Sequence, residues 1–130
     1  MAFFLGPGSG GGAMRLLWVE DHATFVRVAG RQFLAAHAVT VAPSLAEARR
    51  ALAEQTFDAV LLDHDLPDGA GPSLLDFLRQ LPQRPAVVAV SAHDAGNHAL
   101  LQAGADAACP KGRFTEVEAA LSRAVGRARA

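Results

Sequence analysis

Short apolar runs alternate with longer amphipathic segments along this chain, and this alternation is the feature that most limits how it can fold. The apolar runs read as strands, at residues 15–19, 38–42, 57–63, 86–91 and 105–109. A segment with helical periodicity follows each run, at residues 23–36, 43–55, 73–81, 94–103 and 114–125. Such alternation is typical of parallel strands joined by crossover helices.

Local signals support these boundaries. Ser44 and Glu47 form a capping-box pattern, which predicts a helix start. Gly104 follows the fourth helical segment, where a left-handed cap is common. The third run, "FDAVLLD", is apolar almost throughout, as expected for a strand covered by helices on both faces of the sheet.

These elements predict one α/β domain. A length of 130 residues suits a single domain. Right-handed crossovers favour a doubly wound, five-stranded parallel sheet of order 2-1-3-4-5, with a ligand crevice at the carboxyl ends of strands one and three. Residues 1–13, rich in glycine, are predicted to be a flexible leader or an expression remnant. The domain is then residues 14–130.

Polar residues follow the strands at the edge where this crevice is expected. Strand one ends on Glu20 and Asp21, strand three on Asp63, and strand four on Ser91. Lys111, the only lysine of the chain, follows strand five. The predicted strand order brings the three carboxylates together, with the hydroxyl and the ammonium beside them.

This combination predicts a site for phosphoryl transfer onto a carboxylate. Two carboxylates about 5 Å apart repel by roughly 3 kcal/mol at an effective dielectric of about 20, so the cluster requires a cation. Carboxylate oxygens with an open face suit Mg²⁺. Asp63 lies between the acid pair and Ser91 and is the best nucleophile. Lys111 would neutralise charge on the transferring group.

Charge, hydropathy and cysteine content exclude several other classes of protein. The net charge of -1 lacks the basic footprint of a nucleic-acid binder, and no apolar stretch is long enough to cross a membrane. The single cysteine, Cys109, excludes an internal disulfide and fits a reducing compartment, so we expect a cytoplasmic protein. Cys109 itself is interpreted as a small buried strand residue, and His22 as a helix-start residue.

From Met14 onward the chain resembles the receiver domain of bacterial two-component response regulators, which has the flavodoxin-like fold of the chemotaxis receiver. Each motif alone is weak evidence for this family, but four motifs in the right order, each at a strand end, are specific evidence. The matching motifs are "WVED", "VLLDHDLPDGAG", "AVSAHD" and "GADAACPKG".

The resemblance assigns roles to these residues. In the family the phosphoacceptor precedes the loop proline by four positions, which selects Asp63 over Asp65. The family's Mg²⁺ site implies Asp21 and Asp63 as direct ligands, Glu20 acting mainly through water, and the backbone carbonyl of Asp65. Ser91 and Lys111 would bind the phosphoryl group.

The resemblance also implies partners. Receivers take their phosphoryl group from a sensor histidine kinase or a histidine phosphotransfer protein and then change conformation. They are not enzymes beyond self-catalysed phosphotransfer and autodephosphorylation. A downstream protein or a separate output domain would receive the signal, and a homodimer could form through the fourth helix, fifth strand and fifth helix. Asp65 and His93 occupy positions that tune phosphoryl lifetime in the family, although both could be ordinary loop residues.

The chain departs from the family pattern near Lys111. The switch aromatic expected three residues earlier is Ala108, and Gly112 replaces the usual proline, so a cis peptide after Lys111 is not expected. One alternative is therefore a receiver that acts as a phosphorylation-independent interaction module. A second alternative is a haloacid-dehalogenase-like phosphatase, suggested by the "DHD" at a strand end. In this chain the acid pair Glu20 and Asp21 precedes Lys111, and this order argues against the second alternative.

Overall fold

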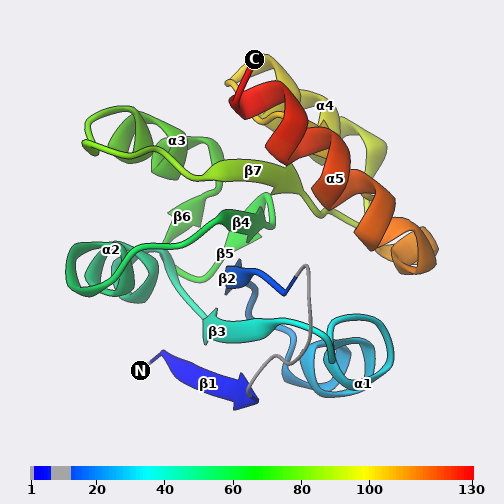
Figure 1. Cartoon of the computed structure of the whole chain (residues 1–130). Coiled ribbons are helices and arrows are strands. Elements are labelled where there is room, and N and C mark those ends of the chain that lie inside the picture. Colours follow the sequence, from blue (N-terminus) through cyan, green and yellow to red (C-terminus); the bar gives the residue numbers. More distant parts are fainter. Residues whose placement is uncertain (1, 7–12) are drawn as a thin grey trace.

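A computed structural model describes residues 2–6 and 13–130 and shows strands and helices alternating along the chain (Figure 1). The strands of the main sheet are β1 (Phe3–Gly6), β2 (Arg15–Val19), β3 (Ala38–Ala42), β4 (Ala59–Leu62), β7 (Ala86–Ala89) and β8 (Ala107–Ala108). The α-helices are α1 (Ala23–Phe33), α2 (Leu45–Glu54), α3 (Pro72–Arg79), α4 (Asp94–Gln102) and α5 (Val117–Ala128). A 3-10 helix, Lys111–Glu116, precedes α5.

The main sheet has the order β1-β3-β2-β4-β7-β8. All neighbouring pairs are parallel except β1 with β3. Trp18 of β2 is in register with Val41 of β3 and with Leu61 of β4, which places β2 and β4 side by side at the centre. The predicted order 2-1-3-4-5 and the α/β class are therefore confirmed.

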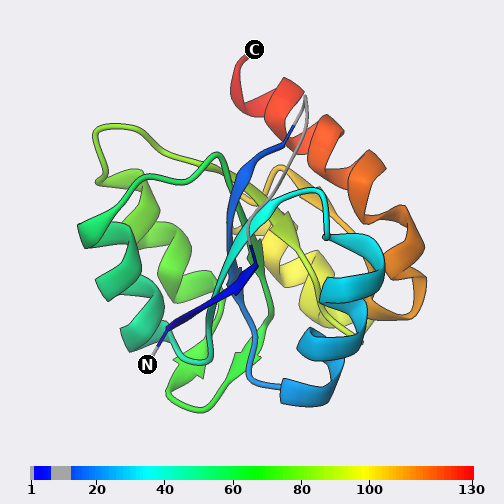
Figure 2. The same cartoon turned by 60° about the horizontal axis from the view of Figure 1, so that its bottom comes forward.

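The strands are buried on both faces because successive side chains point to opposite sides of the sheet. Leu16 and Trp18 belong to a core under α1 and α5, whereas Leu17 and Val19 belong to a core under α2 and α3. Figure 2 shows helices on both sides of the sheet. This double covering explains why the strand sequences are almost continuously apolar. It leaves the carboxyl ends of the strands as the place where polar side chains gather.

Several predicted helix signals are confirmed. The Ser44 hydroxyl accepts a hydrogen bond from the Glu47 backbone N–H at 3.2 Å, and Gly104 has a φ of +118° at the end of α4. Several predicted boundaries differ from the structure. The strands predicted at residues 57–63, 86–91 and 105–109 are shorter, at Ala59–Leu62, Ala86–Ala89 and Ala107–Ala108, and two helices also differ. The first helix ends at Phe33 rather than at residue 36, and the segment from Phe114 begins in the 3-10 helix before α5 starts at Val117.

The edge strand β1 was not predicted, because residues 1–13 were interpreted as a flexible leader and left out of the fold prediction. It pairs with β3 through Phe4 and Thr40. Residues 7–12 of the predicted leader lie outside the described residues, and the boundary at Met14 stays a prediction. A small hairpin of β5 (Asp65–Leu66) and β6 (Gly69–Ala70) follows β4. No helix within the described ranges is long and apolar enough to cross a membrane.

Candidate functional site

The predicted site residues meet at the carboxyl edge of the sheet. Glu20 and Asp21 follow β2, Asp63 follows β4 and Ser91 lies shortly after β7, while Lys111 begins the 3-10 helix after β8. A cleft of about 190 Å³ is lined by Asp21, Asp63, Asp65, Ser91, His93 and Lys111, among others. Parallel strands end at the same edge, so their positions in the sheet alone bring these residues together.

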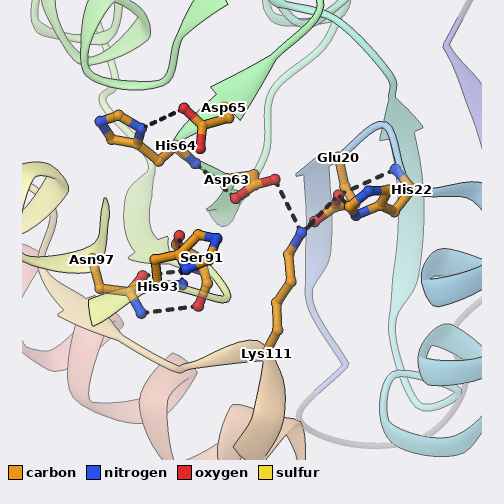
Figure 3. Close-up of polar contacts among 9 residues, drawn as sticks. All are labelled: Glu20, His22, Asp63, His64, Asp65, Ser91, His93, Asn97 and Lys111. Carbon is orange, nitrogen blue, oxygen red and sulfur yellow. Dashed lines mark hydrogen bonds and ion pairs between the residues drawn. The ribbon is translucent and has the colours of Figure 1, made fainter. Parts of the chain in front are cut away.

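Lys111 bridges the carboxylates on the two central strands (Figure 3). Its Nζ lies 2.8 Å from Glu20 Oε1, and it donates hydrogen bonds of 3.0 Å to Glu20 Oε2 and to Asp63 Oδ2. Burial by itself would lower the pKa of Lys111, but its hydrogen bonds to Glu20 and Asp63 and their negative charges outweigh burial and raise this pKa. The ammonium is therefore charged at neutral pH.

Glu20 is the most deeply buried acid of the site, with 1% of its surface exposed. Burial raises the pKa of its carboxyl against the opposing hydrogen bond from Lys111, and the charge of Asp63 raises it further. Glu20 Oε2 also accepts a hydrogen bond from the His22 backbone N–H at 3.2 Å. Oε1 accepts no hydrogen bond from any described residue, despite its short distance to Lys111 Nζ. Because a single ammonium faces two buried carboxylates, their negative charge is not fully neutralised.

The donor set fits a hard divalent cation. Ligand atoms of Glu20, Asp21 and His22 lie within 4.8 Å of one another, and Asp21 is exposed at the mouth of the cleft. Carboxylate oxygens with open positions for water suit Mg²⁺. Glu20 Oε1, which accepts no hydrogen bond although it lies near the Lys111 ammonium, is consistent with this fit, because it has an acceptor position to spare.

Asp63 is held at both carboxylate oxygens. Oδ1 accepts a 2.8 Å hydrogen bond from the His64 backbone N–H, and Oδ2 accepts the one from Lys111. The backbone of Gly71 approaches Asp63 so closely that a Cβ there would lie 2.2 Å from the Asp63 carbonyl oxygen. Only glycine fits at that position. Sequence reasoning missed this role of Gly71, although the glycine itself was part of a quoted motif.

Ser91 is held from α4. Asn97 accepts a 2.8 Å hydrogen bond from the Ser91 backbone N–H and donates one of 3.2 Å to the Ser91 carbonyl, as Figure 3 shows. The Ser91 hydroxyl accepts a 3.2 Å hydrogen bond from the His93 backbone N–H. Ser91 and Asn97 are both buried. Sequence reasoning did not single out Asn97, because an asparagine within a helical segment carries no local signal of such a contact.

The loop residues next to Asp63 form a pair of their own. His64 Nδ1 lies 2.9 Å from Asp65 Oδ1, and the Asp65 side chain is mostly exposed. Asp65 and His93 both line the cleft, as their predicted positions beside the site require. His22 begins α1 as its N-cap residue, in agreement with its interpretation as a helix-start residue.

An aromatic cluster supports the lysine side of the site. Lys111 Nζ lies 5.4 Å from the centre of the Phe25 ring, within the range of a cation–π contact. Phe114 stacks on Trp18 at 5.4 Å and meets Phe25 edge-on at 5.3 Å. Because these rings come from α1, β2 and the 3-10 helix, they hold the segment that carries Lys111 against the sheet.

The strand before Lys111 lacks an aromatic residue. β8 has only two residues, and Ala108 is half-buried next to the core under α2 and α3. The described residues include no cis peptide bond, so the peptide after Lys111 is trans as expected. Cys109 is buried, and burial raises the pKa of its thiol to about 11, which leaves it protonated at neutral pH.

An α/β domain with carboxylates, a hydroxyl and a lysine at the carboxyl ends of its parallel strands has the arrangement expected of a signalling receiver. A sequence model of the response regulator receiver domain matches residues 16–121. The chain therefore belongs to the response regulator receiver domain family. The comparison with curated proteins finds no match.

Solved structures agree with this assignment. The receiver domain of a sensor histidine kinase from Pseudomonas aeruginosa, solved with a magnesium ion in its active-site cleft, is 27% identical and has a TM-score of 0.74, covering 88% of this chain and 99% of that chain. A LuxR-family response regulator from Aurantimonas is 25% identical, with a TM-score of 0.70 and coverage of 85% and 86%. A receiver domain protein from Methanospirillum hungatei, 20% identical with a TM-score of 0.77, shares the fold over 91% and 98% of the two chains.

Proposed function

We propose that this receiver accepts a phosphoryl group on Asp63. The observation that carries the proposal is the bridge from Lys111 to Asp63 and Glu20 beside an open cleft. It supplies a nucleophilic carboxylate together with a fixed positive charge for the transferring oxygens. Family membership supports the same reaction, because receivers are phosphoacceptors in two-component signalling.

The proposed donor is the phosphohistidine of a sensor histidine kinase or of a histidine phosphotransfer protein. A carboxylate oxygen of Asp63 attacks the phosphorus, a P–O bond forms as the P–N bond breaks, and the departing imidazole nitrogen takes up a proton. Lys111 then neutralises charge on the phosphoryl oxygens, and the Ser91 hydroxyl donates a hydrogen bond to one of them. Preorganised charges of this kind account for most of the catalysis in phosphoryl transfer.

Glu20, Asp21, Asp63 and the backbone carbonyl of Asp65 are the groups we propose to hold Mg²⁺. When bound, Mg²⁺ supplies positive charge that offsets the repulsion between the carboxylates and the incoming phosphate. The magnesium ion in the Pseudomonas relative supports this choice of cation. Asp21 would be the direct ligand of the acid pair, since Glu20 is already engaged by Lys111.

The remaining proposals follow from the family. Asp65 and His93, both at the cleft, tune the lifetime of the phosphoryl group, and autodephosphorylation is the only turnover expected. A downstream protein or a separate output domain receives the signal, and a homodimer through α4, β8 and α5 is one way to transmit it. We expect the protein to act in the cytoplasm and to bind no nucleic acid itself.

A second candidate function is an interaction module that needs no phosphorylation. Ala108 favours it, because an alanine cannot provide the large side-chain movement by which receivers usually report phosphorylation. Family membership removes the basis for the dehalogenase-like phosphatase alternative.

Acetyl phosphate with Mg²⁺ tests the proposed function directly. The wild type and Asp65→Asn should gain about 80 Da, the mass of a phosphoryl group, by intact mass spectrometry, whereas Asp63→Asn should gain nothing. Labelling of Asp63→Asn would assign the phosphoacceptor to another residue. No labelling of any form, under conditions where a control receiver is modified, would favour the interaction module.

A further inference from the structure

Two consecutive residues of α4, Gly96 and Asn97, form a socket around Ser91. Asn97 bonds both polar groups of the Ser91 backbone, accepting from its N–H at 2.8 Å and donating to its carbonyl at 3.2 Å. Asn97 is 5% exposed and Ser91 is 2% exposed, so water does not replace these hydrogen bonds easily. A buried backbone group that loses its partner costs free energy.

Gly96 gives the socket its shape. A Cβ at Gly96 would lie 2.5 Å from Ser91 Oγ and 3.1 Å from Ser91 Cβ. The same Cβ would lie 3.1 Å from His64 Cβ, on the residue after Asp63. Any other residue at position 96 would therefore require the Ser91 side chain or α4 to shift.

The two ends of α4 are anchored differently. Its first turns contact the cleft through the socket, whereas arginines from outside the helix hold the chain just after its last turn. Arg79 donates to the carbonyl of Ala103, and Arg84 donates to the carbonyl of Gly104 at 2.8 Å and to Asp106 at 3.0 Å. A displacement that begins at Ser91 thus reaches the first turns of α4 directly and meets fixed contacts at the other end.

We propose that Gly96 and Asn97 are positioning residues for Ser91, and that through them residues 94–98 of α4 move with Ser91 when Asp63 carries a phosphoryl group. If Ser91 shifted alone, its buried N–H would lose its partner on Asn97, and its carbonyl would keep only the 3.2 Å hydrogen bond from the Lys111 backbone N–H. The socket gives the site a mechanical connection to α4 that does not use an aromatic residue at Ala108. This inference rests on the proposed function and names how that function is regulated.

The test compares Asn97→Ala and Gly96→Ala with a matched control, His98→Ala, an exposed neighbour on the same helix. We expect both socket variants to take up the phosphoryl group from acetyl phosphate about tenfold more slowly, because Asn97→Ala removes two buried hydrogen bonds to the Ser91 backbone and the added Cβ of Gly96→Ala collides with the Ser91 hydroxyl. Their Mg²⁺ affinity should stay within about twofold of the wild type, because the proposed metal ligands lie after β2 and β4 rather than on α4. His98→Ala should match the wild type in both measurements.

Amide NMR with Mg²⁺ and beryllofluoride, a phosphoryl mimic, supplies the second measurement. In the wild type, shift changes should extend from Ser91 through residues 94–98 and fade before Gln102. In Asn97→Ala they should persist at Asp63 and Lys111 but disappear from residues 94–98. If Asn97→Ala does not fold, Gly96→Ala tests the same socket, since alanine is the better helix former and a loss would come from the collision with Ser91.

The outcomes separate the two proposals. If the wild type acquires neither a phosphoryl group nor beryllofluoride, the proposed function and the socket fail together. If the wild type acquires both, and the socket variants match it in rate and in the α4 shifts, the socket alone is wrong. A parallel fall in phosphorylation and Mg²⁺ affinity would also overturn it, because that result indicates general damage to the site.

Discussion

The cleft has two halves that are built differently. Glu20 and Asp63, which follow β2 and β4, and Lys111 of the 3-10 helix form a charged half held by ion pairs of 2.8 and 3.0 Å. Ser91, shortly after β7, and Asn97 of α4 form a neutral half held by hydrogen bonds to backbone groups. The carbonyl of Ser91 joins the two, because it accepts from Asn97 and also from the Lys111 backbone N–H at 3.2 Å.

This difference in construction suits the two halves to different tasks, ligand binding and the transfer of a displacement. Ion pairs among buried groups are strongly affected by the charge of a ligand, so the charged half suits binding of a cation and a phosphoryl group. Hydrogen bonds between a side chain and the backbone fix positions and depend little on charge. The neutral half therefore suits the transfer of a displacement to a helix. Variants that damage one half and spare the other test this division.

The largest effect is expected from Lys111→Met, which leaves Glu20 and Asp63 buried without their cation. We expect phosphoryl uptake to fall at least about a hundredfold. The free energy of unfolding without Mg²⁺ should fall by about 3 kcal/mol, the usual cost of removing one partner of a buried ion pair. Intact mass spectrometry and urea denaturation measure the two changes.

Arg113→Met is the matched control for that variant, because it removes a positive charge two residues further on. The Arg113 side chain is exposed and pairs only with Glu116 on the surface, among contacts of the described residues. Its loss should cost less than about 1 kcal/mol. Equal effects of the two variants would mean that Lys111 acts through net charge rather than through its bridge.

Asp21→Asn should abolish Mg²⁺ binding, which we expect at roughly millimolar strength because the protein supplies few ligands. At a Mg²⁺ concentration ten times the dissociation constant, the ion should stabilise the wild type by about 1.4 kcal/mol and the variant not at all. A titration followed by Trp18 fluorescence or by NMR measures the affinity. Asp65→Asn is the control, since only its backbone carbonyl is a proposed ligand. Unchanged affinity in Asp21→Asn would reject the metal assignment.

Phosphorylation should change the surface of β8 and the end of α4 less than in a typical receiver. Ala108 has no large side chain to exchange between buried and exposed positions, and a ligand shifts an equilibrium only through differences between the two states. Ala108→Tyr should enlarge the amide shift changes that beryllofluoride causes at residues 102–109. Large changes there in the wild type would show that another residue performs the role of the aromatic.

The smallest expected effect is a change in stability on substitution of Asp68, which lies in the β5–β6 hairpin outside both halves of the cleft. The backbone N–H groups of Leu45 and Ala46 donate to its carboxylate at 2.8 and 3.0 Å and hold the pKa of Asp68 below its ordinary value. Its contribution to stability is therefore present above the unfolded pKa and is lost as the pH falls through the folded one. Urea denaturation should show a deficit in Asp68→Asn at pH 7 that shrinks in acid. Phosphoryl uptake should not change.

Much of this molecule could be predicted from its sequence, because the relevant signals are local. Apolar runs gave the strands, Ser44 and Glu47 gave a helix start, and the strand order then placed Asp63 and Lys111 at one edge. The proximity of these two residues could be predicted from the strand order alone, without knowledge of any distance. The roles of these residues in phosphoryl transfer remain predictions.

The missed features depend on contacts between distant segments. The Asn97 side chain turns toward Ser91 because the fold places α4 beside the end of β7, and its own neighbours in sequence give no hint of this. The edge strand β1 forms only because β3 offers it an open edge. The 3-10 helix from Lys111 contains Phe114, which contacts Trp18 and Phe25 from distant segments of the chain.

Gly71 shows how a residue without a side chain can govern a chemical group. It carries a hydrogen atom where any other residue carries a Cβ, and a Cβ there would lie 2.2 Å from the carbonyl oxygen of Asp63. A saturation mutagenesis map scored on phosphoryl uptake should therefore rank Gly71 with Asp63 among the least tolerant positions. A reader of such a map who looked only for reactive groups would misassign it. At this position a main-chain contact, not a reactive side chain, determines which substitutions the site tolerates.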